Sequence, residues 1–416
     1  MLRRSLSALA AAALVVAPVL APVPASADNI RDRQQPVLKT LDLATAWRTT
    51  RGKGVTVGVV DTGVDAGNHD FNGAVTTGPN FIKTIDGTTT PKRLHGTAMA
   101  SLIAGRGHGA GNRDGVIGVA PEARIIAVRA LADKEDPSYQ SYRADVEAEA
   151  TAIAGGIRYV VDQGADVINL SLGSYGRGTE IRRSVAYAIE HNVVVVAAVG
   201  NDGDSHLKVD ENGFAPYTYP AAYPGVIGVA ATDPRHERAY FSNRNYSALV
   251  AAPGADIAAG LPRNAYELVS GTSPATALVS GAAALIRARY PKLAPALVAQ
   301  ALLTGTAHRP ASGYDAEVGY GEINAAQALE AAGKLAGYAP TGTGLPSGGR
   351  FVDKKPGPVQ VILRPSWFTG GVFTVGLVSL AGLFGALLAG WLLFRRVFGR
   401  PGLRQDQLPG GAHPPL

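Results

Sequence analysis

A chain of 416 residues with 46% apolar and 17% charged residues can bury one large core, and this composition excludes an intrinsically disordered protein. The formal net charge of +6 comes from bases near the two ends, Arg3, Arg4 and those from Arg350 onward. The region between them is nearly neutral, so we expect no nucleic-acid partner. The absence of cysteine excludes disulfides, a thiol nucleophile and thiolate metal sites.

The first 27 residues have the pattern of a signal peptide. Two arginines precede an apolar stretch over residues 6–23, and Ala25, Ser26 and Ala27 are the small residues that a signal peptidase accepts. A retained N-terminal anchor is the alternative, but the prolines in the stretch and the small-residue site favour cleavage after Ala27. We assign residues 1–27 to the signal peptide and 28–53 to an N-terminal extension.

Residues 54–336 are predicted to form one domain of the α/β class. Its β-branched apolar runs alternate with longer alanine-rich helical patterns, and such runs are typical of strands that are buried on both faces of a parallel sheet. The expected strands are 55–60, 125–129, 167–172 and 193–199. We therefore expect three layers, with a mostly parallel sheet between helices, and a site beyond the carboxyl ends of the strands.

The C-terminal part is predicted to anchor the chain in a membrane. Residues 337–368 are rich in Gly, Pro, Ser and Thr and form a predicted linker, and residues 369–394 carry no charge and are long enough to cross a bilayer. Basic residues open the tail 395–416, so the positive-inside rule places this tail in the cytoplasm. We expect a single-pass protein of the cell membrane whose large domain, residues 54–336, is extracytoplasmic.

Two motifs supply a predicted acid and base. Asp61 directly follows the first strand in VVDTGVD, where its carboxylate could accept a proton from an imidazole. His95, in LHGTAMA, stands at the start of a helical stretch that would fix its ring. His95 is the expected general base, and Asp61 would hold its tautomer and stabilise the imidazolium.

Two further motifs supply a predicted nucleophile and an oxyanion donor. Ser273, in SGTSPA, precedes Pro274 and an alanine-rich helix, which predicts Ser273 at the N-cap and Pro274 at the first helical position. Asn201 ends a strand in AAVGND, and its amide could donate a hydrogen bond to an oxyanion. Each motif alone also occurs in ordinary turns and caps, but all four in order Asp, His, Asn and Ser favour a protease site.

These motifs and their order resemble the subtilase family over Gly54 to Leu329. The matching motifs include GVAPEARIIAVRAL, INLSLG, YPAAYPGVIGVAATD, VAAPG and GYGEINAAQAL. The resemblance implies a subtilisin-like fold, an oxyanion hole that also uses the N–H of Ser273, and an edge that pairs with substrate backbone. The implied substrate-binding residues are Ser171, Leu172, Gly173, Ala198 and Gly200. Pro274 and Ala277 depart from the family pattern, which affects substrate fit beside the nucleophile.

The order of signal peptide, subtilase domain, tether and single span resembles the mycosins, which are proteases associated with type VII secretion. This resemblance implies protein or peptide substrates among exported proteins, and membrane components of the secretion system as partners, with an oligomer within that complex as one option. Two alternatives stay open: a structural stabiliser of the secretion complex whose proteolysis is dispensable, and a general surface subtilase.

No cofactor and no metal are expected from the sequence. The acidic residues that follow Asn201 could attract calcium, but their spacing fits no EF-hand pattern and a solvated loop is the preferred interpretation.

Overall fold

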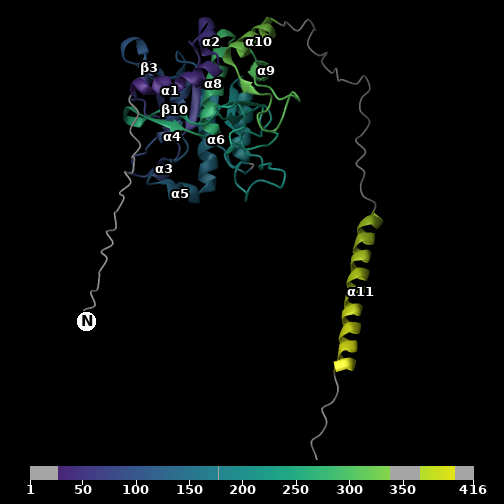
Figure 1. The fold of residues 1–416 in the computed structure, drawn as a ribbon. Coiled ribbons are helices and arrows are strands. Elements are labelled where there is room, and N and C mark those ends of the chain that lie inside the picture. The colour runs from purple at the N-terminus through teal and green to yellow at the C-terminus, as the bar shows by residue number, and fades with distance from the viewer. Residues whose placement is uncertain (1–26, 177, 338–365, 399–416) are drawn as a thin grey trace, which may run out of the picture. The chain divides into compact units, whose positions relative to one another are not determined.

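The computed structural model describes residues 27–176, 178–337 and 366–398, which fall into two bodies (Figure 1). The predicted signal peptide lies outside the described residues except for Ala27. Most of the predicted linker and the end of the predicted cytoplasmic tail also lie outside them.

The larger body, residues 27–176 and 178–337, is built on one long sheet. Within the described residues, nine strands follow the order β12-β13-β9-β8-β7-β6-β1-β5-β2, and neighbouring strands are parallel except for the antiparallel pair β12 and β13. These strands are β1 (Thr56–Asp61), β2 (Val75–Asn80), β5 (Arg124–Arg129), β6 (Val167–Leu170), β7 (Val194–Ala198), β8 (Ile227–Thr232), β9 (Val250–Pro253), β12 (Thr306–Ala307) and β13 (Glu322–Ile323). Two antiparallel hairpins lie apart from it in the described chain, β3 (Arg106–His108) with β4 (Asp114–Ile117), and β10 (Ile257–Leu261) with β11 (Ala265–Val269).

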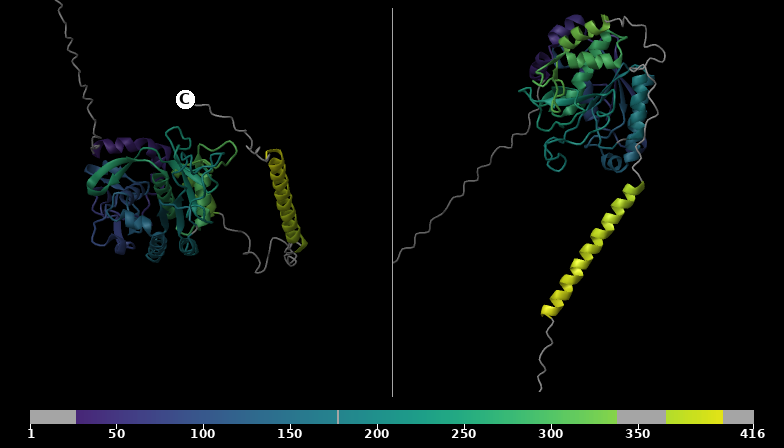
Figure 2. Two further views of the ribbon diagram at one scale, coloured as in Figure 1. Left: turned by 90° about the horizontal axis from the view of Figure 1, so that it is seen from below. Right: turned by 90° about the vertical axis from the view of Figure 1, so that its right-hand side faces the viewer.

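Helices cover both faces of the sheet (Figures 1 and 2). The helices are α1 (Ala27–Thr40), α2 (Leu43–Thr49), α3 (Lys83–Asp86), α4 (Leu94–Ala104), α5 (Tyr139–Ala144), α6 (Val146–Asp162), α7 (Thr179–Glu190), α8 (Thr272–Arg289), α9 (Pro295–Thr304) and α10 (Ala325–Gly337). Short 3-10 turns span His69–Phe71, Ala110–Asn112 and Pro262–Asn264. Helix α8 packs against β6, β7, β8 and β9 on one face, and α6 packs against β1 and β5 on the other.

Alternate residues of each central strand enter two separate apolar cores. Val57 and Val59 of β1 lie in the core shared with α4 and α8, whereas Val60 lies in the core shared with α6 and α7. Gly58 faces α6 so closely that a Cβ atom there would lie 2.7 Å from the side chain of Val160. Strands buried on both faces are the reason for the continuous apolar runs in the sequence.

The predicted fold class is confirmed, and each predicted strand matches an observed one closely. Sequence reasoning missed two buried strands, β8 and β9, and the shorter or more polar ones. Strand β2 runs along one edge of the sheet with largely exposed side chains, and β12 and β13 have two residues each.

Residues of the N-terminal extension are fastened to the body by side-chain hydrogen bonds. Gln34 of α1 accepts from the backbone N–H of Ile117 at 2.9 Å and donates back to its carbonyl at 3.2 Å. Arg31 donates to the Gly115 carbonyl at 3.0 Å. Helix α1 therefore packs against β4 and β10 and belongs to the same compact body.

The second body is the helix α11 (Ser366–Phe398), which includes the predicted span. Its stretch Val378–Arg396 has a mean hydropathy of 1.7, and among the described residues this helix is the one whose length and composition suffice to cross a membrane. Arg395 and Arg396 lie in its last turn.

Candidate active site

The four predicted motifs meet at one edge of the sheet. Asp61 is the last residue of β1, and Asn201 follows the end of β7. His95 lies in the first turn of α4, and Ser273 in the first turn of α8. Because β1 and β7 belong to a parallel sheet, their carboxyl ends share an edge, where the polypeptide can present side chains from several segments.

Asp61 and His95 form a hydrogen-bonded pair. His95 Nδ1 lies 2.8 Å from Asp61 Oδ1, which also accepts the N–H of Thr62 at 2.7 Å. The Asp61 side chain is fully buried, while that of His95 is 36% exposed. Since a carboxylate can only accept, Nδ1 carries the shared proton, and Nε2 keeps a lone pair for a base to use.

A glycine brings the start of α4 against the turn after Asp61. The N–H of Gly96 donates to the Thr62 hydroxyl at 3.0 Å, and a Cβ at Gly96 would lie 2.2 Å from the carbonyl oxygen of Gly63. Any side chain at this position would push the helix, and with it the ring of His95, away from Asp61.

Asp133 holds the same helix start and was missed from the sequence. Its two carboxylate oxygens accept the N–H of Leu94 at 2.8 Å and that of His95 at 3.0 Å. Asp133 is buried just beyond the carboxyl end of β5, a position typical of site residues, but its local sequence has no motif that marks it. The structure thus adds a second carboxylate that positions His95.

The electrostatic surroundings make His95 a stronger base than a free histidine. Burial works against the charged imidazolium, but the nearby negative charge and hydrogen bond of Asp61, followed by the charge of Asp133, outweigh it, and the pKa of His95 is raised above 6.5. Burial raises the pKa of Asp133 as well, although the two helical N–H groups oppose this shift.

Ser273 lies two residues further into its helix than predicted. Helix α8 begins at Thr272 with Gly271 as its N-cap, so the prediction of Ser273 at the N-cap and Pro274 at the first helical position was wrong. The physical reason is that a residue distant in the sequence, Asn201, caps the start of α8. The amide oxygen of Asn201 accepts from the N–H and from the hydroxyl of Thr272, at 2.8 and 2.9 Å.

These bonds also orient the Asn201 amide. With its oxygen occupied by Thr272, its NH₂ group is turned the other way, and it has no acceptor among the described residues. The Ser273 hydroxyl donates to the carbonyl of Ser171 at 3.2 Å, and the Ser171 hydroxyl donates to the carbonyl of Ser273 at 3.0 Å. The described hydrogen bonds thus link Ser273 to Ser171, and His95 to Asp61, without a direct bond between His95 and Ser273.

A pocket of about 360 Å³ adjoins His95. Of the residues predicted to bind substrate, Ser171, Leu172 and Gly173 line it, whereas Ala198 and Gly200 lie at the end of β7 outside its lining. Neither Leu172 nor Gly173 exchanges a backbone hydrogen bond with another described segment. Apolar and charged side chains share the rest of the wall, among them Leu131, Lys134, Glu135, Tyr139, Tyr142, Arg143, Glu149 and Ile181.

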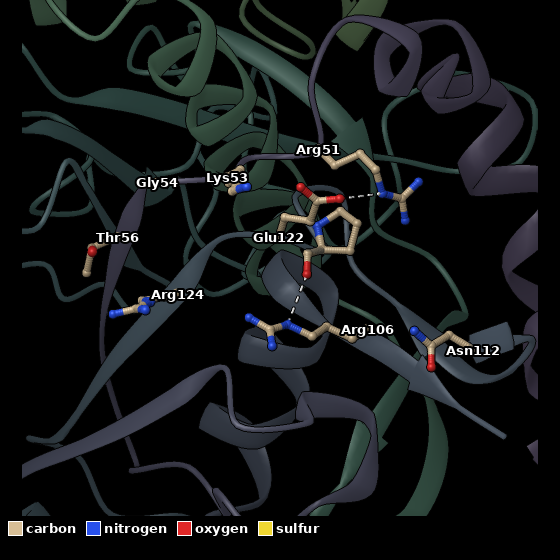
Figure 3. Close-up of a pocket in the computed structure, with 9 residues that line it drawn as sticks. Arg51, Lys53, Gly54, Thr56, Arg106, Asn112, Glu122 and Arg124 are labelled. Atoms are coloured by element: carbon tan, nitrogen blue, oxygen red, sulfur yellow. Dashed lines mark hydrogen bonds and ion pairs between the residues drawn. The ribbon is translucent and has the colours of Figure 1, made fainter.

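A larger hollow of about 870 Å³ lies at the other edge of the sheet, at the amino ends of β1 and β5 (Figure 3). Its lining is basic, with Arg51, Lys53, Arg106 and Arg124 around Glu122, which pairs with Arg51 at 3.4 Å. None of the predicted site residues lines it. Sites in parallel sheets form at the carboxyl ends, so the smaller pocket beside His95 is the candidate active site.

Comparisons with known proteins identify the family of this chain. The profile of the Subtilase family matches residues 52–321. Thermitase from Thermoactinomyces vulgaris is 37% identical over 243 residues, covering 58% of this chain and 77% of that protein. An intracellular serine protease from Paenibacillus polymyxa is 36% identical over 246 residues, covering 58% and 69%.

Solved structures of mycosins are similar as well. The MycP3 protease from the type VII (ESX-3) secretion system has a TM-score of 0.58 and 30% identity, covering 71% of this chain and 88% of that one. MycP1 from Mycobacterium smegmatis has a TM-score of 0.58 and 25% identity, covering 71% and 84%. The family match spans most of the larger body and the relatives are serine proteases, so the chain belongs to the subtilase family of serine endopeptidases.

Proposed function

We propose that this subtilase is a membrane-anchored endopeptidase that processes exported proteins with Asp61, His95 and Ser273 as its triad. The observation that carries the proposal is the 2.8 Å bond between buried Asp61 and His95 at the sheet edge where α8 begins. That bond leaves the Nε2 lone pair of a histidine with a raised pKa as the base.

In the proposed reaction, His95 Nε2 takes the proton of Ser273 as the serine oxygen attacks a peptide carbonyl. The hydroxyl must first turn from the Ser171 carbonyl toward His95, and catalytic hydrogen bonds often tighten only when substrate binds. His95 then gives the proton to the leaving amine, and Asp61 stabilises the imidazolium in between. Water hydrolyses the acyl-enzyme by the same steps.

The oxyanion of the intermediate would be bound by two donors. One is the side-chain amide of Asn201. Its oxygen is held by Thr272, and its NH₂ group has no acceptor among the described residues. The other is the N–H of Ser273, which lies in the first turn of α8. Pro274 has no N–H to offer, so its place after Ser273 removes neither donor. Leu172 and Gly173 would pair with the substrate backbone as an added strand.

The test is labelling of the full chain in detergent with a fluorophosphonate serine-hydrolase probe. We expect the native protein to be labelled and Ser273→Ala not to be. Ser270→Ala is the matched control, because this exposed serine three residues earlier bonds only Asp256 among the described residues, and we expect it to be labelled normally. A folded native chain that does not react would contradict the proposed site and favour a structural role.

Helix α11 supports the proposal of a membrane anchor with an extracytoplasmic catalytic domain. Its 19-residue apolar stretch spans about 28 Å at 1.5 Å per residue, close to a bilayer core of about 30 Å, and two arginines end it. Since the chain has no cysteine, a single introduced cysteine is unique. On intact cells, a membrane-impermeant maleimide should label Glu211→Cys but not Gln407→Cys, and the reverse pattern would contradict this topology.

The link to type VII secretion rests on the similarity to the MycP3 and MycP1 proteases. We expect a strain with Ser273→Ala to export proteins that keep uncleaved segments, which mass spectrometry of their termini detects. If export stops in a deletion strain, but a strain with Ser273→Ala exports the same proteins with the same termini as the native strain, the chain stabilises the secretion complex instead. If neither strain alters type VII export, the chain is a general surface protease.

A further inference from the structure

Three potential metal ligands meet outside the active site. His236 lies in the turn after β8, His308 follows β12, and Glu322 opens β13. The Nδ1 atoms of His236 and His308 lie 2.7 and 3.2 Å from the same carboxylate oxygen, Glu322 Oε2. The Thr232 hydroxyl donates to the other oxygen, Oε1. Residues far apart in the sequence thus aim their donor atoms at one point.

Both histidines are held in an unusual arrangement. Their rings are stacked with centroids 3.8 Å apart and an interplanar angle of 11°. Both also have left-handed backbone conformations, with φ of 65° for His236 and 46° for His308. Such conformations are unfavourable for residues with a side chain, and they persist where the surrounding structure or a function requires them.

The carboxylate of Glu322 lacks a permanent counter-charge. Its side chain is 1% exposed, and in the described parts of the chain no lysine or arginine pairs with it. Burying a carboxylate without a cation is costly. Two neutral imidazoles that donate Nδ1–H to the same oxygen supply hydrogen bonds but no charge. A bound cation would take the place of the two Nδ1 protons, each ring would carry its proton on Nε2 instead, and the ion would neutralise the carboxylate.

We propose that His236, His308 and Glu322 bind one divalent transition-metal ion, with Zn²⁺ as the best match. Two imidazole nitrogens and one carboxylate oxygen are donors that Zn²⁺ accepts, whereas Ca²⁺ and Mg²⁺ prefer oxygen. The candidate ligand atoms all lie within 4.8 Å of one another. Zinc bonds of about 2.0–2.1 Å in tetrahedral geometry place ligands roughly 3.3 Å apart. The ligand atoms would therefore draw closer together, and the two stacked rings would tilt until the ion lies near the plane of each ring.

The coordination shell would be completed from solvent. The side chains of His236 and His308 are 34% and 47% exposed, so water can reach a fourth position. Thr232 would orient Glu322 from behind, as outer hydrogen bonds orient metal ligands generally. Sequence reasoning did not single out this site, because the two histidines stand in unrelated segments and Glu322 lies within a family motif.

A bound ion would connect residues at the edge strands β12 and β13 to the turn after β8. Two backbone hydrogen bonds connect the end of β8 to the residue before helix α8. The N–H of Gly254 donates to the Thr232 carbonyl at 2.9 Å, and the N–H of Gly271 donates to the Gly254 carbonyl at 2.8 Å. Gly271 is the N-cap of the helix that carries Ser273. Metal binding therefore stabilises the folded state on the side of the sheet that supports the nucleophile.

The test is a calorimetric titration of the full chain, stripped with a chelator and held in detergent, with Zn²⁺ at neutral pH. We expect one ion per chain and a higher melting temperature with Zn²⁺. Replacement of either histidine by Asn, which tolerates a left-handed backbone, should weaken binding about 10-fold or more, and Thr232→Val about 10- to 100-fold. Co²⁺ in place of Zn²⁺ should show the visible absorption of a low-coordinate site.

His206→Asn is the matched control, because His206 is an exposed loop residue outside the cluster. It should bind Zn²⁺ as the native chain does. Native chain that takes up no Zn²⁺ would overturn the proposal whether or not the variants fold. Equal uptake by the native chain and the folded His236→Asn, His308→Asn double variant would overturn it as well, and the cluster would then be a hydrogen-bonded packing element only.

Discussion

Replacing Arg129 with methionine removes the cation from a buried network behind Asp61. The guanidinium donates to both oxygens of Asp86 at 2.7 Å, to Asp136 at 2.9 Å and to the Thr62 carbonyl at 2.8 Å. The side chains of Asp86 and Asp136 are 3% and 0% exposed, so both would stay buried without a cation. Breaking a buried ion pair from one side costs about 3–5 kcal/mol, and we expect the free energy of unfolding to fall by at least that amount.

The assay is urea unfolding of the full chain in detergent, followed by far-UV circular dichroism. Arg124→Met is the matched control, because Arg124 opens the same strand, is exposed, and has no ion pair in the described structure. Its effect should stay within about 0.5 kcal/mol. Equal destabilisation by the two variants would refute the reasoning that the buried carboxylates depend on Arg129.

The same network predicts a pH dependence of the difference between native protein and Arg129→Met. Burial raises the pKa of Asp86, but hydrogen bonds from Arg129, Asn80 and Ser138 outweigh it and leave the pKa below 3.8. A carboxyl whose pKa is lower in the folded state stabilises that state above its unfolded pKa, and this contribution is lost as the pH falls through the folded pKa. The difference in stability should therefore be largest well above pH 3.8 and should shrink in acid.

Other consequences concern activity and the helix starts. If His95 is the general base, only its neutral form acts, and because its pKa is raised, kcat/KM should rise with pH through a midpoint above 6.5; a flat profile between about pH 5 and 8 would contradict this. Asp133→Asn should move that midpoint to lower pH and reduce the rate, since it removes a negative charge and one acceptor from the start of α4; steady-state kinetics across pH test both effects. Asn201→Ala should lower kcat by about 10²–10³, the loss measured in subtilisin, with KM little changed. Gly96→Ala should cost about 1–3 kcal/mol in urea unfolding, because its Cβ would meet the Gly63 carbonyl, and an unchanged midpoint would refute that close approach.

Much of the sheet could be predicted because its central strands are buried on both faces. Strands β1, β5, β6 and β7 consist of apolar runs with polar residues or turns at their ends, and these runs are visible in the sequence. Strand β2 is exposed and polar at the sheet edge, and β13 has only Glu322 and Ile323, so neither produces a hydrophobic pattern. Their pairing depends on neighbouring strands, which a local pattern does not record.

Some residues of the candidate site could also be predicted from the sequence, and others could not. Asp61, His95, Asn201 and Ser273 could be singled out because each stands in a short motif at the end of a strand or the start of a helix. Contacts between segments that are distant in the sequence could not be predicted. The cap on Thr272 comes from Asn201, 71 residues away in sequence, and its absence from local reasoning led to the wrong N-cap at Ser273. Asp133 likewise supports His95 from 38 residues away.

The most direct measurement is the rate of fluorophosphonate labelling of native chain and Asp61→Asn, each in detergent across the pH range. If Asp61, His95 and Ser273 work as one unit, the native rate rises through the raised pKa of His95. The variant, which lacks the charge that stabilises the imidazolium, should label slower by about 10⁴-fold, the loss measured for this change in a triad protease. A folded Asp61→Asn that labels as fast as the native chain would show that Ser273 is not activated through His95 and Asp61.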